Sequence, residues 1–431
     1  MLCPGDARMV EGDAALPGLR VLLDPEAFGA ALARLCGTAI TSATPTYARY
    51  KPGTSCLVAY DVRTEERGAS VPVYARTHAG PDALSKTRKA AERPAVAGPL
   101  GAGTFVSDDP PLAVFVFPND HVLRALARLA EPGERTRLLG KALNDHGRPA
   151  ITSLERLRYK PERRFVGRAS VHGGASMFVK LYTEEDAPAC IANARAFYSE
   201  GPLRVACLLG SHERRGLAVW EWVEGKPLLD SHDGPLGLRA PSILAGAALA
   251  CLHHQNANLP FTYDPSRCAD MLAESRDAIG AISPTHAKRA QQLAERLVNC
   301  FAAHKPVPIH GDFSASQVLL TGNSATFLDF DRAGQGPAVL DLGNFLANLE
   351  SLAITGEIRQ ADMSACAGGV LDGYARSRLG EGCDELRART LAPTAFSLFR
   401  IAVEPFRSRR VDWPELLDAY LTRAEVLLGN A

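Results

Sequence analysis

The sequence of 431 residues lacks a surplus of charge of either sign and any apolar run long enough to span a membrane. Lysine and arginine together number 48, as do aspartate and glutamate, so the formal net charge is zero. Nucleic-acid binding draws much of its affinity from basic side chains set against phosphates, so no nucleic-acid partner is expected. The longest apolar stretch, residues 242–252, precedes two histidines and is typical of a buried helix, so no membrane partner is expected either.

Cysteine pairs are also lacking. The ten cysteines are scattered, and none forms a CxxC motif, which excludes zinc ribbons and thioredoxin-like redox sites. The first sixteen residues include acidic side chains and have no apolar segment of the kind found in secretory signals. The sequence therefore predicts a cytoplasmic protein whose cysteines are reduced thiols, packed as small apolar side chains.

What the sequence does contain is an internal repeat. Residues 39–42 (AITS) recur at 150–153, and residues 49–52 (RYKP) recur at 158–161. Matching strand-like runs follow in the same order, at 55–62, 71–77 and 112–117 in the first copy and at 164–171, 176–182 and 217–222 in the second. Matched blocks in a fixed order predict a duplicated module built on an antiparallel sheet.

After residue 227 the pattern changes to helical periodicity. The expected helices span residues 242–254, 269–282, 286–303, 341–352, 363–379, 392–403 and 412–428, with a short strand pair between 307 and 331. We therefore expect four parts. They are a helical cap at 1–35, an accessory sheet module at 36–148, a second sheet module at 149–227, and a helical part at 228–431.

The helical part contains acids in loops that follow short apolar runs. His310-Gly311-Asp312 begins one such segment, which continues to Gln317, and Phe327-Leu328-Asp329-Phe330-Asp331 forms the other. An acid in such a loop can approach a substrate hydroxyl, and an acid after a short apolar strand can hold a divalent metal. Phosphoryl transfer needs both groups, because one carboxylate positions the attacking hydroxyl and oxygen ligands hold Mg²⁺ on the phosphates.

This ordered set of motifs resembles the catalytic core of the aminoglycoside phosphotransferase family, whose relatives include choline kinases and, more distantly, protein kinases. The family pattern is H-G-D-x-x-x-x-N, then a strand ending in D-F-D, then a helix that starts D-L-A/G. The resemblance implies an α+β, protein-kinase-like fold with two lobes. An antiparallel sheet lobe at 149–227 would bind nucleotide, and a mainly helical lobe at 228–431 would carry the catalytic and metal loops. The module at 36–148 would be a duplicate of the nucleotide lobe.

The resemblance also implies roles for residues of the two loops. Asp312 matches the catalytic base, and His310 would orient the catalytic loop. Asp329 matches the Mg²⁺ ligand, while Asp331 would contact the metal or form a turn. Gln317 stands where the family has Asn and would offer its amide oxygen to the metal, and a Gln at this place is similar to what maltokinase-like sugar kinases show. Beyond these loops, Asp341 would brace the catalytic loop from a helix start or simply cap that helix.

On the nucleotide side, Lys180 lies on the strand at 176–182, where the family has the lysine that contacts the α- and β-phosphates. Glu221, Trp222 and Val223 would form the hinge between the lobes, where backbone groups bind adenine. The expected helix at 187–198 has no acid in its middle to pair with Lys180. This is a departure from the family, as is Gln317.

The resemblance predicts an ATP- and Mg²⁺-dependent phosphotransferase that moves the γ-phosphate to a hydroxyl of a small molecule. That acceptor would be a sugar, an amino sugar or an aminoglycoside-like natural product. Acids between residues 224 and 274 are scattered, so a neutral sugar fits the sequence as well as a polycation does. The basic cluster at 407–410 is more typical of a solvated helix end than of an anion site.

Two other interpretations stay open. One is a kinase of peptide Ser or Thr in natural-product biosynthesis, whose leader segment could dock on the accessory module. The other is a kinase-like scaffold without activity, which the two departures from the family would favour. The accessory module itself has Arg76 at the position of Lys180 and no catalytic loop after it. It would therefore serve as a cap, a docking surface or a homodimer interface.

Overall fold

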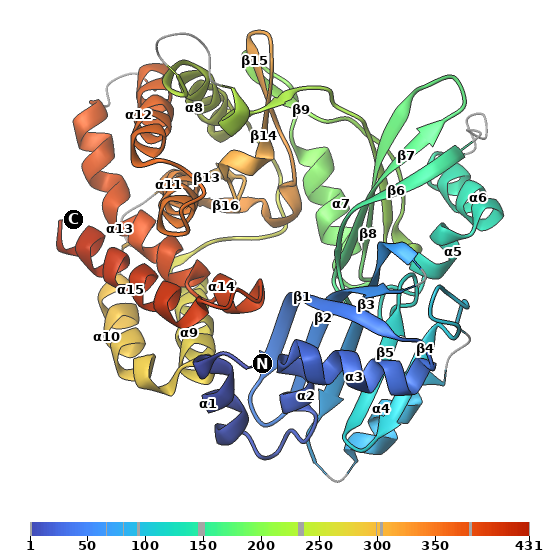
Figure 1. Ribbon diagram of the computed structural model, residues 1–431. Coiled ribbons are helices and arrows are strands. Elements are labelled where there is room, and N and C mark those ends of the chain that lie inside the picture. The colour runs from blue at the N-terminus through green and yellow to red at the C-terminus, as the bar shows by residue number, and fades with distance from the viewer. Residues whose placement is uncertain are drawn as a thin grey trace.

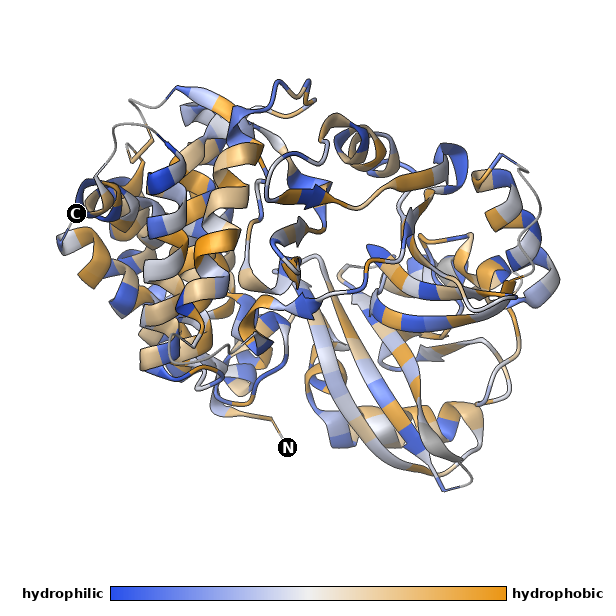
Figure 2. Ribbon diagram, turned by 90° about the horizontal axis from the view of Figure 1, so that it is seen from above, coloured by the Kyte–Doolittle hydropathy of each residue, from blue (hydrophilic) through white to orange (hydrophobic). Residues whose placement is uncertain are grey.

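The computed structural model describes residues 2–430 except 66, 81, 93–94, 145–150, 232–236, 299, 302–304 and 379–381. Two five-stranded antiparallel sheets form one side of the molecule, and a bundle of helices forms the other (Figure 1). Hydrophilic and hydrophobic residues alternate along the long strands, as expected of sheets with one face in a core (Figure 2). In the described part of the chain, no helix combines the length and apolar character needed to cross a bilayer.

The two sheets have the same topology. The first has the order β1-β2-β3-β5-β4, and the second has the corresponding order β6-β7-β8-β11-β10. The strands of the first are β1 (Ile40–Lys51), β2 (Ser55–Thr64), β3 (Arg67–His78), β4 (Thr104–Asp108) and β5 (Pro111–Val116). Those of the second are β6 (Ile151–Lys160), β7 (Arg164–Val171), β8 (Ser176–Tyr182), β10 (Leu208–His212) and β11 (Leu217–Glu221). A helix follows the third strand in each copy, α4 (Ala83–Ala91) and α7 (Ala187–Ala196). The predicted duplication is therefore confirmed.

The repeat also includes helices that precede each sheet. Asp13 accepts hydrogen bonds from the Tyr50 hydroxyl and the Gly53 N–H, both at 2.8 Å. In the second copy Asp120 accepts the equivalent bonds from the Tyr159 hydroxyl (2.7 Å) and the Glu162 N–H (2.9 Å). Each aspartate precedes a helix pair, α2 (Leu19–Leu23) with α3 (Pro25–Cys36), and α5 (Leu126–Ala130) with α6 (Pro132–Ala142).

This repeat moves the boundary between the modules. Leucines of α5 and α6 share a core with Phe165, Val179 and Val219 of the second sheet. The boundary expected at residues 148 and 149 falls outside the described residues, and it would separate these helices from the sheet that they cover. We infer that the second module begins at Asp120, because the buried contacts of α5 and α6 belong to that module.

The helical lobe contains each of the helices expected after residue 227. They are α8 (Arg239–His254), α9 (Pro265–Ile282), α10 (Ala287–Leu297), α11 (Ala338–Ile354), α12 (Gln360–Ser377), α13 (Cys383–Ile401) and α15 (Trp413–Gly429), with the short α14 (Glu404–Arg407) before the last. Helix α13 begins well before the expected residue 392, and Pro393 lies inside it. Gly343 of α11 makes room there, because a Cβ atom at Gly343 would lie 2.6 Å from the Pro393 backbone.

The strands near the catalytic loop form two small sheets, so the predicted strand pair is present but is only part of the arrangement. One sheet has the order β12-β14-β15-β9, and the other pairs β13 with β16. These strands are β9 (Leu203–Val205), β12 (Lys226–Pro227), β13 (Pro306–Ile309), β14 (Val318–Thr321), β15 (Ser324–Phe327) and β16 (Gly334–Pro337). The HGD segment therefore connects β13 to β14, and the DFD segment connects β15 to β16. Both loops start at the end of a strand, and β13 and β16 pair with each other.

The first module also packs against the helical lobe. Helix α1 (Pro4–Gly12) lies beside α9 and α15 in Figure 1, and its Met9 shares a core with Met271 and Trp413. Asp6 of α1 forms an ion pair with Arg409 at 2.6 Å, and both side chains are only 5% exposed. The indole N–H of Trp413 also donates to Asp6, at 3.2 Å. A buried charged pair with this further hydrogen bond ties the N-terminal segment to the helical lobe.

Candidate active site

The turn at Gly311 places the HGD segment, the predicted catalytic loop, against the DFD segment, called here the metal-acid loop. Gly311 has a φ of +78°, a conformation that glycine adopts without the steric cost of a Cβ atom. A Cβ atom there would lie 1.9 Å from the carbonyl oxygen of Arg332, so the two loops touch through their backbones. The same carbonyl accepts a hydrogen bond from the Tyr263 hydroxyl at 2.6 Å.

Asp341, in the first turn of α11, braces the catalytic loop. Its carboxylate accepts the backbone N–H groups of His310 (2.7 Å) and Gly311 (2.8 Å). Nε2 of His253 lies 3.0 Å from the same carboxylate, and both side chains are fully buried. Burial lowers the pKa of His253 despite the nearby carboxylate, so the neutral ring donates its Nε2–H to Asp341. These contacts match the bracing role that the resemblance implied for Asp341.

His310 is fully buried and connects the two loops. Its Nε2 lies 2.8 Å from the carbonyl oxygen of Leu328, the residue before Asp329. The ring packs against Phe330, with 4.8 Å between ring centres. A side chain in this position cannot reach a substrate, so His310 is a positioning residue. Asp312, two residues later, is exposed and forms no hydrogen bond through its side chain to another described residue.

The two acids of the DFD segment meet cations from the second sheet. Nζ of Lys180 lies 2.8 Å from Asp329 and 3.0 Å from Asp331. Arg164 donates to both carboxylates, at 3.1 Å and 2.5 Å, and the Tyr182 hydroxyl donates to Asp331 at 2.7 Å. Burial opposes ionisation of Asp329, but Lys180 and Arg164 outweigh it and lower the pKa of this carboxyl well below its usual range. Burial and the neighbouring Asp329 raise the pKa of Asp331.

These acids and Gln317 suit Mg²⁺, a hard cation that prefers oxygen ligands. The amide oxygen of Gln317 is buried and has no hydrogen-bond partner among the described residues. No group of three His, Cys, Asp or Glu side chains that could hold a metal occurs in the part of the chain that the structure describes. The protein ligands would therefore be two carboxylates and one amide, and Mg²⁺ usually completes such a set with water and phosphate oxygens.

Lys180 pairs with the DFD acids instead of a helix acid. Helix α7 presents Asn193, whose side-chain N–H₂ donates to the carbonyl oxygens of Ala333 (3.1 Å) and Asp331 (3.4 Å). Its amide oxygen is buried and has no partner among the described residues. The helix therefore holds the backbone of the metal-acid loop, which the sequence did not indicate. Arg164 and Tyr182 were also missed, because nothing in a strand pattern shows which side chain will face a distant loop.

The expected hinge begins at Glu221, the last residue of β11. The N–H of Glu221 donates to the carbonyl of Cys207 at 3.0 Å, so it is not free to bind a base. The backbone N–H groups of Trp222 and Val223 form no hydrogen bond to another described residue. Arg168 lies over the Trp222 ring, with its guanidinium carbon 4.3 Å from the ring centre. Of the three predicted hinge residues, Trp222 and Val223 are therefore the two whose backbone N–H groups have no described partner.

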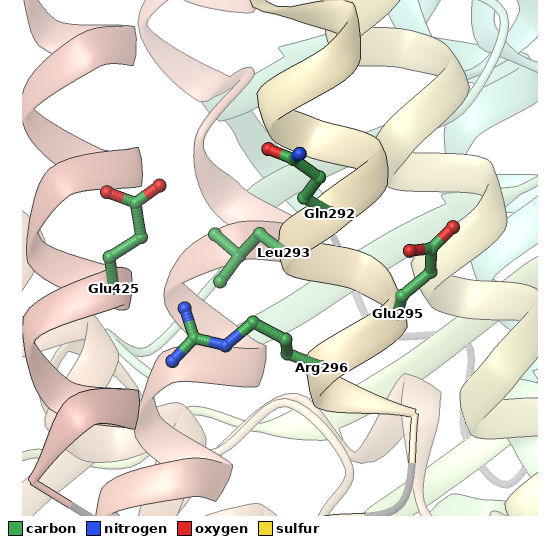
Figure 3. A pocket seen from close by; sticks show the side chains of 5 residues that line it. All are labelled: Gln292, Leu293, Glu295, Arg296 and Glu425. Carbon is green, nitrogen blue, oxygen red and sulfur yellow. The ribbon is translucent and has the colours of Figure 1, made fainter.

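A surface pocket elsewhere belongs to a different part of the molecule. It lies between α10 and α15, and Glu425 faces Gln292, Leu293 and Arg296 across it (Figure 3). Arg289 of α10 donates to Glu425 at 2.8 Å beside it. The pocket shares no residue with the catalytic or metal-acid loops, so it is not part of the candidate active site.

Several solved structures are similar to this chain. A choline/ethanolamine kinase family protein from Mesorhizobium loti is 18% identical, with a TM-score of 0.47, and the match covers 68% of this chain and 94% of that chain. A thermostable mutant of aminoglycoside phosphotransferase APH(4)-Ia, in a ternary complex with ADP and hygromycin B, is 13% identical, with a TM-score of 0.46 and coverage of 65% and 95%. A GDP complex of an aminoglycoside 2′-phosphotransferase-IIIa mutant is 14% identical, with a TM-score of 0.49 and coverage of 69% and 98%.

A family model gives the assignment. No curated protein sequence matches the chain. The model of the phosphotransferase enzyme family (APH) matches residues 165–379, which run from β7 to the end of the α12 region and include both loops of the candidate site. The protein is thus a kinase of the phosphotransferase type, with a hydroxyl group as acceptor. Its segment 165–379 belongs to the phosphotransferase enzyme family, the family that the HGD and DFD motifs resemble.

Proposed function

We propose that the protein transfers the γ-phosphate of ATP, with Mg²⁺, to a hydroxyl of a small molecule. The observation that carries this proposal is the cluster of Lys180 with Asp329 and Asp331, at 2.8 Å and 3.0 Å. It unites a phosphate-binding cation of the sheet lobe with two metal-binding acids of the helical lobe. A nucleotide triphosphate with its metal matches this mixture of charges, because the phosphates need cations and the metal needs carboxylates.

Each residue of the cluster has a role in this proposal. Lys180 and Arg164 bind phosphate oxygens, and Asp329, Asp331 and Gln317 hold the metal. Mg²⁺, when bound, neutralises charge on the phosphates and on the leaving oxygen. Catalysis then comes mainly from positioning and from fixed charges, since phosphoryl transfer asks for little covalent chemistry from the protein.

Asp312 acts on the acceptor. The acceptor oxygen bonds to the γ-phosphorus, and the bond from this phosphorus to the β–γ bridging oxygen breaks, so ADP leaves. The hydroxyl proton passes to the Asp312 carboxylate. Asp312 is exposed and unengaged, whereas Asp341 holds its loop rigidly, and this combination supports a base that meets a substrate from solution. A peptide acceptor and a homodimer through the first module stay predictions.

The first experiment measures ADP release with Mg·ATP against pools of aminoglycosides, neutral sugars, hydroxy acids, sugar phosphates, nucleosides and Ser/Thr peptides. Asp312→Asn should lower kcat about 10²–10⁴-fold, the usual contribution of a general base, while ATP binding is retained. Asp277→Asn, at an exposed carboxylate of α9, is the matched control and should have wild-type kcat. Full activity of Asp312→Asn would remove Asp312 as the base. Absence of Mg²⁺-dependent ATP binding by the wild type would favour the inactive scaffold.

A further inference from the structure

We infer that the acceptor carries an anionic oxygen group, a carboxylate or a phosphate, which Arg332 and Arg400 bind while its hydroxyl faces Asp312. This inference rests on the proposed function, because it names the acceptor class of the same site. It departs from the polycation and the neutral sugar that the sequence left open. Three features of the described residues carry it: the position of Arg332, the unpaired state of Arg400, and the charge balance around Asp312.

Arg332 is fixed beside Asp312 by its backbone. Its carbonyl oxygen touches Gly311, the residue before Asp312, and is held by the Tyr263 hydroxyl at 2.6 Å. Its side chain is exposed and forms no ion pair or hydrogen bond with a described residue. The Asp312 carboxylate is the strongest of the groups that act on the Arg332 guanidinium, and it raises the pKa of Arg332. The guanidinium therefore lies near the proposed base and remains open to a ligand.

Arg400 is a second unpaired arginine near the same carboxylate. It lies in the last turn of α13, half-buried, with its guanidinium carbon 5.6 Å from the ring centre of Phe396. No carboxylate within the described ranges forms an ion pair with it. Burial and the neighbouring Arg332 lower the pKa of Arg400 to about 10, while Asp312 and Tyr263 act in the opposite direction. A partly buried cation without a partner costs stability, which an anionic ligand would restore.

The charges around Asp312 have a positive surplus. Lys160 lies in the same group of charges, because burial lowers its pKa, Glu404 raises it and Arg332 lowers it. Its Nζ lies 5.5 Å from the ring centre of Tyr47. Glu404 acts on both Lys160 and Arg332, but Arg407 already pairs with it at 2.8 Å. A polycationic acceptor would meet repulsion here, and a neutral sugar would leave both arginines unpaired. Arginine pairs carboxylate and phosphate groups with two parallel hydrogen bonds, so an oxyanion fits best.

The basic cluster at 407–410, which the sequence singled out, is not this site. Arg407 is paired with Glu404, Arg409 with Asp6, and Arg410 with Asp412 at 2.8 Å. Each of these guanidinium groups therefore has a carboxylate partner within the protein. Arg332 and Arg400, by contrast, have no carboxylate partner among the described residues, although they lie far apart in the sequence.

The test compares acceptors that differ in charge. ADP release is measured with glycerol and glycerate, with ribose and ribose 5-phosphate, and with glucose, glucose 6-phosphate and glucosamine. We expect kcat/KM for an anionic member to exceed that of its neutral counterpart at least tenfold. Arg400→Met and Arg332→Met should each raise the acceptor KM about tenfold and leave the KM for ATP within twofold. Arg400→Lys should restore part of the loss, and Arg407→Met, the matched control, should keep the preference for anions.

Other results would overturn the inference. Preference for glucosamine or for neutral members, with turnover that still depends on Asp312, would reject the anionic acceptor but leave the proposed function intact. A rise in the KM for ATP instead of the acceptor would assign the arginines to the nucleotide. If no member is phosphorylated, binding of glycerate and inorganic phosphate is measured with a non-hydrolysable Mg·ATP analogue bound. These anions should then raise the Tm of the wild type, and both arginine variants should abolish that rise. No rise in the wild type, or a rise that the variants keep, would reject the anion site. Absence of ATP binding would instead reject the proposed function itself.

Discussion

At the scale of single residues, the site depends on carboxylates in contrasting surroundings. Asp312 is exposed and unengaged, Asp341 is fully buried and bonded on each side, and Asp329 is paired with two cations. The different surroundings give the same residue type different roles. A buried carboxylate that accepts two backbone N–H groups fixes geometry, whereas an exposed one can accept a proton.

Asp341→Asn should reduce the stability of the catalytic loop, although Asp341 itself does not contact the substrate. The amide that replaces the carboxylate turns one acceptor into a donor, which then faces a backbone N–H or the Nε2–H of His253. The loss of a buried bond to a charged group should cost about 1–3 kcal/mol of unfolding free energy. We expect kcat to fall while the KM for ATP is unchanged, as measured by urea denaturation and ADP release. Asp372→Asn on α12, which disturbs the ion pair with Arg239 of α8, is the control. An equal loss of kcat in both variants would show that the effect is general destabilisation.

At the scale of elements, the helices before each sheet form part of the repeated unit. The duplication of strands was visible in the sequence, because AITS and RYKP recur almost unchanged. The helices before the first sheet were expected as a cap, but their repetition escaped notice because only sparse positions are shared between the copies, chiefly an aspartate and spaced leucines. Their structural role became clear from the shared core of α5 and α6 with the second sheet.

Leu129→Ala in α5 tests whether these helices stabilise the nucleotide lobe. Leu129 is fully buried in the core under the second sheet, so its truncation leaves a cavity. Replacement of a buried leucine by alanine typically costs about 2–5 kcal/mol. Hydrogen exchange should accelerate in β6, β7 and β8 more than in β1, β2 and β3. Leu22→Ala in α2, at the corresponding place of the first module, should give the opposite distribution. Equal acceleration in both sheets would show that the modules do not unfold separately.

Much of the element pattern could be predicted, whereas several contacts of the site could not. Helical periodicity predicted the long helices of the C-terminal part, but β16 reads GQGP and carries no strand signal of its own. It becomes a strand because β13 lies beside it and supplies hydrogen-bond partners. In the same way, the HGD and DFD motifs marked the two loops. No motif marked four further side chains of the site, which are Arg164, Asn193, Arg332 and Arg400. Their contribution depends on tertiary packing, which local patterns do not encode.

At the scale of the whole molecule, the first module holds the second through Glu162. Arg49 and Arg76 both pair with this carboxylate, which is 4% exposed, and Arg76 stands where the second module has Lys180. Glu162 has a φ of +59°, and the corresponding residue of the first module, Gly53, has a φ of +56°. A glutamate in this conformation costs about 1–2 kcal/mol relative to glycine, so the ion pairs account for its presence.

A double-mutant cycle measures this connection. Glu162→Gln removes the charge and keeps the backbone conformation, and Arg76→Met removes one partner. The two changes should be non-additive by about 0.5–3 kcal/mol of unfolding free energy, as found for residues in one ion-pair network. Because Arg164 lies two residues beyond Glu162, the KM for ATP should also rise in Glu162→Gln. Arg88→Met, which breaks an exposed pair with Asp108, is the control and should be additive with Glu162→Gln. Additivity of Glu162→Gln with Arg76→Met would mean that the modules are held together elsewhere.

The first module contacts the nucleotide lobe at Glu162 and the helical lobe at Asp6, while residues 222–225 join those lobes directly. The three bodies thus form a closed ring, whereas two lobes joined by a hinge alone form an open chain. Two bodies connected at one place can rotate about many axes, but a second attachment leaves only the axis that passes through both. Separation of the nucleotide lobe from the helical lobe therefore requires the first module to move as well, or one of its ion pairs to break.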